Sequence, residues 1–302
     1  MSMRNERGFA LVLTLVVTAL LIAVATEFIH EVYVETSLNR NYVNLQQASL
    51  LAESGIKGGM ALIRQFGNNA TDPQFLALVG QPQQLDDERG TVSITIEDES
   101  GKLNLNAVTL PSGDPNTAYD TVERRLLELL GLPAELHDTL ADWVDLNDAP
   151  LPGGAESSYY RSLPTPYSAK NGPFDTFGEL GLVKGITPPI LNALRGYCTV
   201  YGLDYPININ TAPAKVLEAL DSDMTDALAK AIIDRRSTKP FTTPGELSNI
   251  PGMEQIFPRI SGIIRTNGAV YRLVAEATVG EVKRIVEAVV DTNGNYLYWR
   301  EY

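Results

Sequence analysis

The sequence predicts an α+β protein with a long N-terminal helix, an antiparallel sheet built from both ends of the chain, and a large helical insertion between them. Three observations predict this class. An apolar run from Phe9 to Thr26 continues into an amphipathic pattern, with no proline before Pro73. Strand-like alternation occurs at 91–97 and again at 270–300. Helical periodicity and an internal repeat fill the region from 103 to 265.

The N-terminal segment has the composition of a membrane anchor. Arg4 and Arg7 precede Gly8, and the next eighteen residues, 9–26, carry no charge. A helix of that length rises roughly 27 Å, close to the thickness of a bilayer's hydrocarbon core. The basic leader favours a cytoplasmic N-terminus. A secretory signal peptide would end in a small-x-small cleavage site. No such break occurs here, so we predict a leader over 1–8 and a membrane span over 9–27.

The helix is predicted to continue well beyond the membrane. Apolar residues recur every three or four positions, which places them on one helical face, at Leu45, Ala48, Ala52, Ile56, Met60 and Ile63. An unbroken helix from Phe9 to Phe66 would be a rod of roughly 87 Å. The pair Gly58-Gly59 is where we expect weakening or a bend.

The ends of the chain supply the sheet. Thr91 to Glu97 alternates apolar and polar residues, and two further strand-like runs, 270–279 and 282–291, flank a Gly280-Glu281 hairpin turn. Tyr296 to Arg300 is predicted as an edge strand, and Gly67 to Arg89 as a loop. We therefore assign 28–102 and 266–302 to one α/β unit, and 103–265 to an inserted helical domain.

The inserted region contains a repeat. The pattern F-x-T-x-G-E-L occurs at 174–180 and at 241–247, and a glycine, Gly185 or Gly252, follows at the same offset. Upstream, L-N-L-N at 103–106 matches I-N-I-N at 207–210. The copies span 103–187 and 207–253. Their predicted helices are Val122 to Leu130, Pro133 to Asp145, Ala214 to Leu220 and Thr225 to Arg236.

Each copy resembles a helix-hairpin-helix, or SAM-like, unit. Such hairpins often give backbone N–H groups to nucleic-acid phosphates. This chain is acidic, with a net charge of −13, and only the first turn carries a lysine, Lys184. Tight binding to phosphates needs clustered Lys and Arg. We expect structural reuse of the motif without nucleic-acid binding, and a membrane-tethered DNA-binding protein is the alternative.

One loop distinguishes the copies. Aligning Asp142 with Asp234 leaves about 25 extra residues in copy one, before Phe174. The loop contains Asp145, Asn147 and Asp148, and Glu156 follows a Pro-Gly-Gly turn. Carboxylate and amide oxygens at such positions suit Ca²⁺. A solvated acidic loop, with Asp145 capping a helix end, fits the spacing equally. Tyr159, Tyr160 and Tyr167 argue against disorder, and the absence of nearby His or Cys disfavours zinc.

Arg7-Gly8-Phe9 before an apolar helix resembles the leader of type IV prepilins and type II secretion pseudopilins. The resemblance implies that a prepilin peptidase cuts between Gly8 and Phe9 and methylates Phe9. The family usually has Glu at the fifth mature position, where this chain has Leu13. K-type minor pseudopilins are known for this absence. A buried carboxylate without a partner is costly, and a tip subunit has no neighbour above it to supply one.

The body of the chain resembles the same K-type family (general secretion pathway protein K) over about residues 8–290. The resemblance rests on W-V-D-x-N-D, P-G-G-A-E-x-x-Y-Y and I-N-I-N-T-A-P. It implies a helical domain inserted into a pilin-type α/β fold, and a loop that binds calcium. The implied ligands are the matching positions Asp142, Asp145, Asn147, Asp148 and Glu156. Asn147 stands where the family commonly has an acid, so this loop has one charge fewer.

The implied function is that of a minor pseudopilin at the tip of the type II secretion pseudopilus, which initiates or caps assembly for export across the outer membrane. Its partners would be the I-type and J-type minor pseudopilins, the major pseudopilin and the prepilin peptidase. It would cross the bacterial inner membrane once, with its C-terminal domain in the periplasm. A minor pilin of a type IV pilus is the alternative. His30 and His137 have no nucleophile at a recognisable spacing, so we expect no enzyme activity.

Overall fold

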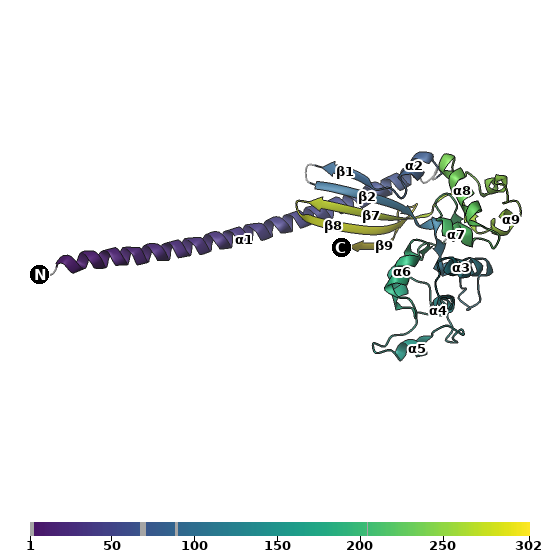
Figure 1. Cartoon of the computed structure of the whole chain (residues 1–302), viewed down its shortest axis with the longest axis horizontal. Helices are drawn as coiled ribbons and strands as arrows, with labels where there is room; N and C mark the ends of the chain where they lie inside the picture. The colour runs from purple at the N-terminus through teal and green to yellow at the C-terminus, as the bar shows by residue number, and fades with distance from the viewer. Residues whose placement is uncertain (1–2, 67–70, 88–89, 204) are drawn as a thin grey trace.

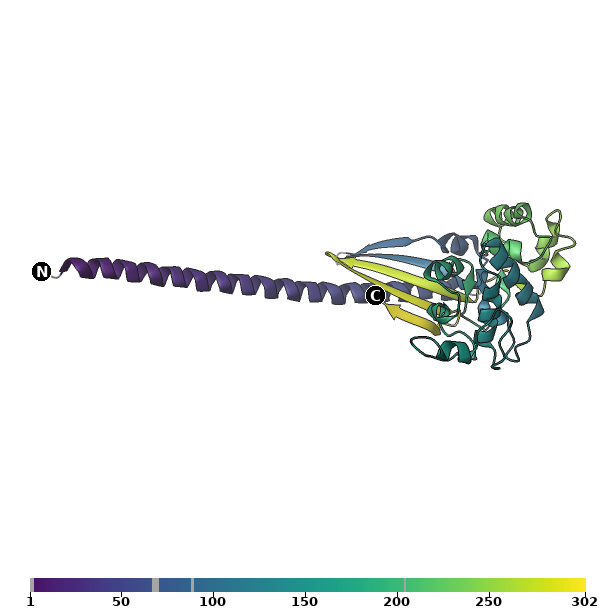
Figure 2. The same cartoon turned by 60° about the horizontal axis from the view of Figure 1, so that its bottom comes forward.

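The computed structural model describes residues 3–66, 71–87, 90–203 and 205–302. A single long helix, α1 (Met3–Phe66), forms a shaft, and a sheet packs against its C-terminal part (Figure 1). A helical unit lies at the end of the molecule opposite the N-terminus, as both views show (Figures 1 and 2). This arrangement confirms the predicted fold class. Residues 1–2 of the predicted leader and 67–70 and 88–89 of the predicted loop lie outside the described residues.

The shaft is one continuous helix of 64 residues. Its residues from Gly8 to Val43 are exposed, and they include a stretch long and apolar enough to cross a membrane. The predicted apolar face is buried from Ala48 to Ile63. The helix continues through the Gly58-Gly59 pair, where we expected weakening. Gly59 lies so close to the sheet that a Cβ there would be 2.9 Å from Leu273, so this glycine permits close packing.

The sheet has five antiparallel strands in the order β1-β2-β7-β8-β9. Side chains that alternate along β2, β7 and β8 face α1 and form one apolar core with it. Val279 pairs with Val282 across the predicted two-residue turn, where Gly280 has a φ of 58°. The strands are β1 (Gln83–Asp87), β2 (Gly90–Asp98), β7 (Val270–Val279), β8 (Val282–Asp291) and β9 (Tyr296–Glu301).

The prediction of a loop from Gly67 to Arg89 was wrong in part, because this region contains a short helix and a strand. Helix α2 (Pro73–Leu78) begins after Asp72, whose side chain accepts a hydrogen bond from the Gln74 N–H at 2.8 Å. Asp as the N-cap with proline in the first turn is a regular helix start. Strand β1 pairs with β2 at the edge of the sheet. Its sequence, QQLDD, lacks apolar alternation, and residues 83–86 are exposed or half-buried, so the pairing with β2 is what holds this strand in the sheet.

The inserted unit consists of two copies of one arrangement. Each copy is bracketed by a short parallel strand pair, β3 with β4 in the first and β5 with β6 in the second. The hairpin glycines Gly185 and Gly252 have φ values of 84° and 93°, which glycine adopts most readily. The first copy contains β3 (Leu103–Asn104), η3 (Leu105–Ala107), α3 (Thr117–Leu129), α4 (Glu135–Val144), α5 (Ser157–Arg161), η4 (Phe177–Leu182), α6 (Pro188–Arg195) and β4 (Cys198–Thr199).

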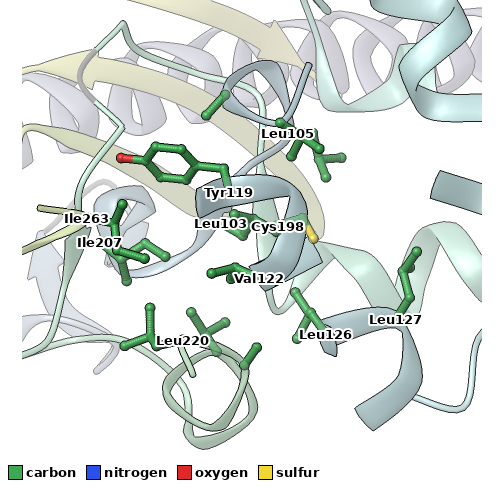
Figure 3. Packing of buried hydrophobic residues seen from close by; sticks show 14 of the residues in the cluster. Leu103, Leu105, Tyr119, Val122, Leu126, Leu127, Cys198, Ile207, Leu220 and Ile263 are labelled. Atoms are coloured by element: carbon green, nitrogen blue, oxygen red, sulfur yellow. The ribbon is translucent and has the colours of Figure 1, made fainter. Parts of the chain in front are cut away.

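The second copy contains β5 (Ile207–Asn208), α7 (Ala214–Ala219), α8 (Asp226–Thr238), η5 (Pro244–Asn249), α9 (Phe257–Ile260) and β6 (Ile264–Arg265). The four helices predicted for the two copies are confirmed as α3, α4, α7 and α8, with ends shifted by a few residues. The two copies share one core. Figure 3 shows Val122 and Leu126 of α3 beside Leu220, which follows α7, and buried Cys198 lies in the same cluster.

Candidate metal centre

The loop that interrupts the repeat follows α4 and is ordered by aromatic packing. Tyr160, in the short helix α5, is fully buried. Its ring lies 5.1 Å from that of Trp143 and 5.2 Å from that of Tyr167, measured between centroids. Trp143 also stacks on Phe174, at the end of the loop. These contacts close the loop onto the helical core, so the acidic residues it carries have fixed positions.

Three carboxylates, from the two ends of this loop segment, lie close together. Asp142 and Asp145 come from the last turn and C-cap of α4, and Glu156 immediately precedes α5. One oxygen from each lies within 4.8 Å of the others. All three residues are at most 2% exposed. Oxygens bound to a common Ca²⁺ at about 2.3–2.6 Å are separated by no more than about 5 Å, so this spacing fits one shared cation.

Glu156 is the residue whose surroundings point most clearly to a ligand. Neither of its carboxylate oxygens has a hydrogen-bond partner among the described residues, and the side chain is buried. Burial, together with the charges of Asp142, Asp145 and Asp148, raises the pKa of Glu156 to about 7. Burial also raises the pKa values of Asp142 and Asp145. Unpaired buried carboxylates are unfavourable unless a cation compensates them.

The Pro-Gly-Gly turn is held against two of the aspartates. The Leu151 N–H donates to both carboxylate oxygens of Asp142 at 3.2 Å, and the Gly153 N–H donates to Asp138 Oδ2 at 2.9 Å. A Cβ on Gly154 would lie 1.9 Å from Asp142 Oδ2. Only glycine fits so close an approach at position 154. The turn is thus packed directly against Asp142, with its N–H groups bonded to Asp138 and Asp142.

Asn147 and Asp148 have other contacts. The Asn147 side-chain oxygen accepts from the Ala149 N–H at 2.7 Å, and the Asn147 N–H donates to Asp145 Oδ1 at 2.9 Å. Asp148 is not one of the three clustered carboxylates. Its Oδ1 accepts from Asn171 Nδ2 at 3.3 Å. These two residues shape the turn after α4, and the metal-ligand role of all five predicted positions stays a prediction.

Three residues near the cluster were missed by sequence reasoning. Asp138 lies one helical turn before Asp142, and that i, i+4 spacing was a usable signal. Asn171 has a φ of 48°, and its buried Oδ1 has no partner among the described residues. Lys184 was considered only for phosphate binding, and its contact with the loop from the first hairpin was missed. Neither Asn171 nor Lys184 could be found from the sequence, because each depends on contacts made across the fold.

The donor set fits a hard cation. Three carboxylates supply charge, and backbone carbonyls of the same loop could complete the six to eight oxygens that Ca²⁺ takes. The three clustered groups include neither His nor Cys, and oxygen-only donors favour Ca²⁺ or Mg²⁺ over zinc. The flexible geometry of an irregular loop suits Ca²⁺ better than the strict octahedron of Mg²⁺.

The hairpins that suggested nucleic-acid binding already use N–H groups within the chain. In the first hairpin, the Lys184 N–H donates to the Tyr160 hydroxyl at 3.2 Å. In the second, the Gly252 N–H donates to the Glu254 carboxylate at 2.9 Å. A carboxylate at this position both occupies the donor and repels a phosphate.

The predicted processing site, Gly8 and Phe9, lies on the exposed part of α1. Phe9 is 71% exposed, and Leu13, the residue at the position of the missing acid, is 52% exposed. A Cβ on Gly8 would meet no atom within 4 Å. The cluster of carboxylates is therefore far along the chain from the processing site and lies in the helical unit at the opposite end of the molecule (Figure 1).

Comparison with known proteins identifies a family that matches most of the helical unit. Two family models, each described as "Type II secretion system (T2SS), protein K", match residues 101–203 and 207–263. Together they match more than half of the 302 residues. The first match contains the acidic loop, and the second contains most of the second copy.

Individual relatives agree with these matches. The type II secretion system protein K of Pseudomonas aeruginosa is 28% identical over 300 residues, covering 94% of this chain and 88% of the relative. A putative type II secretion system protein K of Escherichia coli K12 is 29% identical, covering 80% and 78%. A crystal structure of the GspK-GspI-GspJ complex from enterotoxigenic E. coli contains a chain with a TM-score of 0.73 and 19% identity, covering 89% of this chain and 99% of that chain.

Proposed function

This chain belongs to the type II secretion system protein K family, whose members are minor pseudopilins, and we propose that it caps the tip of the pseudopilus. The observation that carries the tip position is the place of the helical unit, which extends past the end of α1 and the sheet (Figure 2). In a fibre built from parallel shafts, this bulk would occupy the space where the next subunit would add. Leu13 supports the same position, because a tip subunit needs no acid to pair with a neighbour above.

We infer that the shaft is anchored in the bacterial inner membrane and that the rest of the chain lies in the periplasm. The support is the apolar stretch of α1, the one helix among the described residues that is long and apolar enough to cross a membrane, and the basic residues Arg4 and Arg7 on its N-terminal side. Cleavage between Gly8 and Phe9, followed by methylation of Phe9, would remove the first residues of α1 and leave Phe9 as the mature N-terminus. Mass measurement of the protein purified from cells with the peptidase should show the loss of residues 1–8 and the gain of one methyl group. An uncleaved product would overturn this step, and Gly8→Val should abolish cleavage.

The chain's partners are proposed to be the I-type and J-type minor pseudopilins. A solved relative of the same fold is described in a complex with both. Full-length chain co-expressed with the two proteins in detergent should elute as a ternary complex in size-exclusion chromatography. A monomer that never associates would contradict the proposal. A complex that assembles only with type IV pilus subunits would favour the alternative of a minor pilin.

We propose that Asp142, Asp145 and Glu156 hold a calcium ion, with Asn147 and Asp148 shaping or completing the site. The ion would supply positive charge to the buried carboxylates, and it would stabilise the folded loop because the unfolded chain offers no such site. Calorimetric titration of the full chain with Ca²⁺ should show saturable binding, and chelator should lower the thermal midpoint. Absence of both effects would exclude the metal.

We infer that the chain is a structural subunit and a substrate of the prepilin peptidase, not an enzyme. The histidines support this. His30 is exposed on the shaft, and His137 is buried in a pair with Glu123, in which Nδ1 and Oε2 are 2.5 Å apart. We also expect no nucleic-acid binding, given the internal partners of both hairpins. A gel shift at physiological salt would contradict that expectation.

A further inference from the structure

Lys184 belongs to the first hairpin, yet its side chain reaches into the loop that carries the acidic cluster. Its ammonium group donates to the Gly154 carbonyl at 2.9 Å and to the Gly153 carbonyl at 3.2 Å. Both bonds connect segments about 30 residues apart in the chain. A charged donor to a carbonyl is a strong hydrogen bond, so these contacts fix the turn relative to the hairpin.

The same residue holds the loop at two further points. Its backbone N–H donates to the hydroxyl of buried Tyr160 at 3.2 Å. Its Nζ also lies 5.2 Å from the centroid of the Tyr159 ring, within the range of a cation–π contact. The next residue in the hairpin, Gly185, has a φ of 84°. Lys184 therefore contacts the loop on both sides of Glu156.

The turn held by Lys184 is the one that presses on the carboxylates. Gly154 lies directly against Asp142, and Glu156 follows two residues later. Asp138 and Asp142 bind the N–H groups of this turn, while Lys184 binds its carbonyls. The turn is thus held by the aspartates on its N–H side and by Lys184 on its carbonyl side. Loss of either set of contacts would move Glu156 relative to Asp142 and Asp145.

We propose that Lys184 is a positioning residue for the cation site: by fixing the Gly153–Gly154 carbonyls and the Tyr160 hydroxyl, it holds Glu156 in place to meet Asp142 and Asp145. This inference rests on the proposed function, namely that the loop binds a divalent cation. The first hairpin thus holds the acidic loop and does not serve to bind nucleic acid. The second hairpin has Pro251 at the matching position and no inserted loop to hold.

Lys184 has two opposing effects on calcium affinity, and the direction in which its removal changes that affinity shows which effect is larger. A positive charge near a cation site weakens cation binding by repulsion. A residue that pre-organises the ligands strengthens binding by lowering the ordering cost. If positioning prevails, removing the ammonium group loosens calcium binding. If repulsion alone matters, the same change tightens it.

The test uses the full-length chain in detergent and three variants: Lys184→Met, Lys184→Arg and, as the matched control in the second hairpin, Glu254→Gln. Ca²⁺ affinity is measured by competition with Tb³⁺, whose emission Trp143 and Tyr160 can sensitise from beside the site. We expect Lys184→Met to bind about tenfold more weakly, the loss of one or two charge-assisted bonds. Lys184→Arg, which keeps the charge and has N–H donors for both carbonyls, should recover most of the affinity, and Glu254→Gln should match the original chain.

Thermal midpoints with and without Ca²⁺ distinguish positioning from a general structural role. Positioning predicts a smaller calcium-induced rise for Lys184→Met, with a similar midpoint in chelator. Unchanged or tighter binding by Lys184→Met would overturn the inference, as would an equal drop in midpoint with and without Ca²⁺. Failure of the original chain to bind Ca²⁺ or Tb³⁺ would instead overturn the proposed metal site, and the inference with it.

Discussion

Asn106 and Phe174 exchange two hydrogen bonds across 68 residues of sequence. The Phe174 N–H donates to Asn106 Oδ1 at 2.8 Å, and Asn106 Nδ2 donates to the Phe174 carbonyl at 3.0 Å. The same Nδ2 group also donates to the Val200 carbonyl at 2.9 Å. One carboxamide therefore joins the start of the first copy, the end of its inserted loop and the residue that follows its closing strand, β4.

The second copy repeats this relationship. The Phe241 N–H donates to Asn210 Oδ1 at 2.8 Å, and Asn210 Nδ2 donates to the carbonyls of Phe241 and Thr266 at 2.9 and 2.7 Å. Each asparagine acts as both donor and acceptor, which no carboxylate can do when ionised. The two repeats visible in the sequence are thus the same hydrogen-bonded unit built twice.

Replacing either asparagine by aspartate should strongly destabilise the chain. Asn106→Asp and Asn210→Asp each place an acceptor opposite backbone carbonyls and remove two donor bonds. We expect each to lower the free energy of unfolding by about 2–4 kcal/mol, measured by urea denaturation of the full chain in detergent. Exposed Asn249 provides the control, and Asn249→Asp should change stability by under about 0.5 kcal/mol. Equal effects at all three positions would contradict the paired-carboxamide role.

The two adjacent glycines of α1 should respond in opposite directions to leucine. Gly59 packs against Leu273, whereas a Cβ on Gly58 would meet no atom within 4 Å. Gly58→Leu should stabilise the helix by about 0.5–1 kcal/mol, because glycine is a poor helix former. Gly59→Leu should destabilise it by about 1–3 kcal/mol through overpacking. Urea midpoints of the two variants provide the comparison, and similar values would exclude close helix–sheet contact at Gly59.

Gly154→Ala should remove most of the stabilisation that calcium gives. The new methyl group would overlap Asp142 Oδ2, so either the carboxylate or the turn must move. Saturating Ca²⁺ stabilises a site by about 2.7 kcal/mol at a hundredfold excess over Kd, and the variant should lose most of this. Gly196→Ala is the matched control, because Gly196 has a φ of −77° and open space around it. A Gly154→Ala chain that keeps its full calcium-induced rise in thermal midpoint would contradict the geometry.

Glu156→Gln should stabilise the metal-free chain while removing its response to calcium. The Glu156 oxygens are buried without partners among the described residues. A neutral amide removes an unpaired charge from that position and, with it, a ligand. In chelator, we expect the thermal midpoint of the variant to rise above that of the original chain. In Ca²⁺, we expect the thermal midpoint of the variant to fall below that of the original chain. A variant that is less stable in both conditions would show that Glu156 is a structural hydrogen-bonding residue.

The His137–Glu123 pair should make stability depend on pH. Burial lowers the pKa of His137, but the hydrogen bond and charge of Glu123, aided by Asp120 and opposed by Arg124, raise it above its usual value of 6.5. A raised histidine pKa gives stability that is complete below the unfolded-state pKa and is lost as pH rises through the folded-state pKa.

His137→Gln should therefore cost more stability at about pH 6 than at about pH 9. The measurement is the urea midpoint of the full chain at both pH values, in chelator so that the metal site does not contribute. Exposed His30 is the control, and His30→Gln should leave the urea midpoint unchanged at both pH values. A loss for His137→Gln that grows with pH would show that the pair is stabilised in its neutral form.

Much of the fold was predictable because it depends on short-range patterns. The face of α1 from Ala48 to Ile63 followed from helical periodicity, and the hairpin at Gly280 followed from two alternating runs around a glycine. Strand β1 was missed because its polar sequence is stabilised by pairing with β2 rather than by its own pattern. Helix α2 had a recognisable Asp72-Pro73 start, but it lies in a region rich in Gln, Asp, Pro and Gly, a composition that predicted a loop.

The sequence alone determined the order of the parts: an anchor, a shaft, a sheet shared by the two ends, and a helical unit with one acidic insertion. These follow from hydrophobic period and repeat spacing, which are properties of neighbouring residues. Only the tertiary structure decided which acids meet. It brings Asp142, Asp145 and Glu156 together, leaves Asp148 bonded to Asn171, and extends Lys184 over the turn. Those distances depend on how the hairpin packs against the loop, and no local spacing in the chain contains that information.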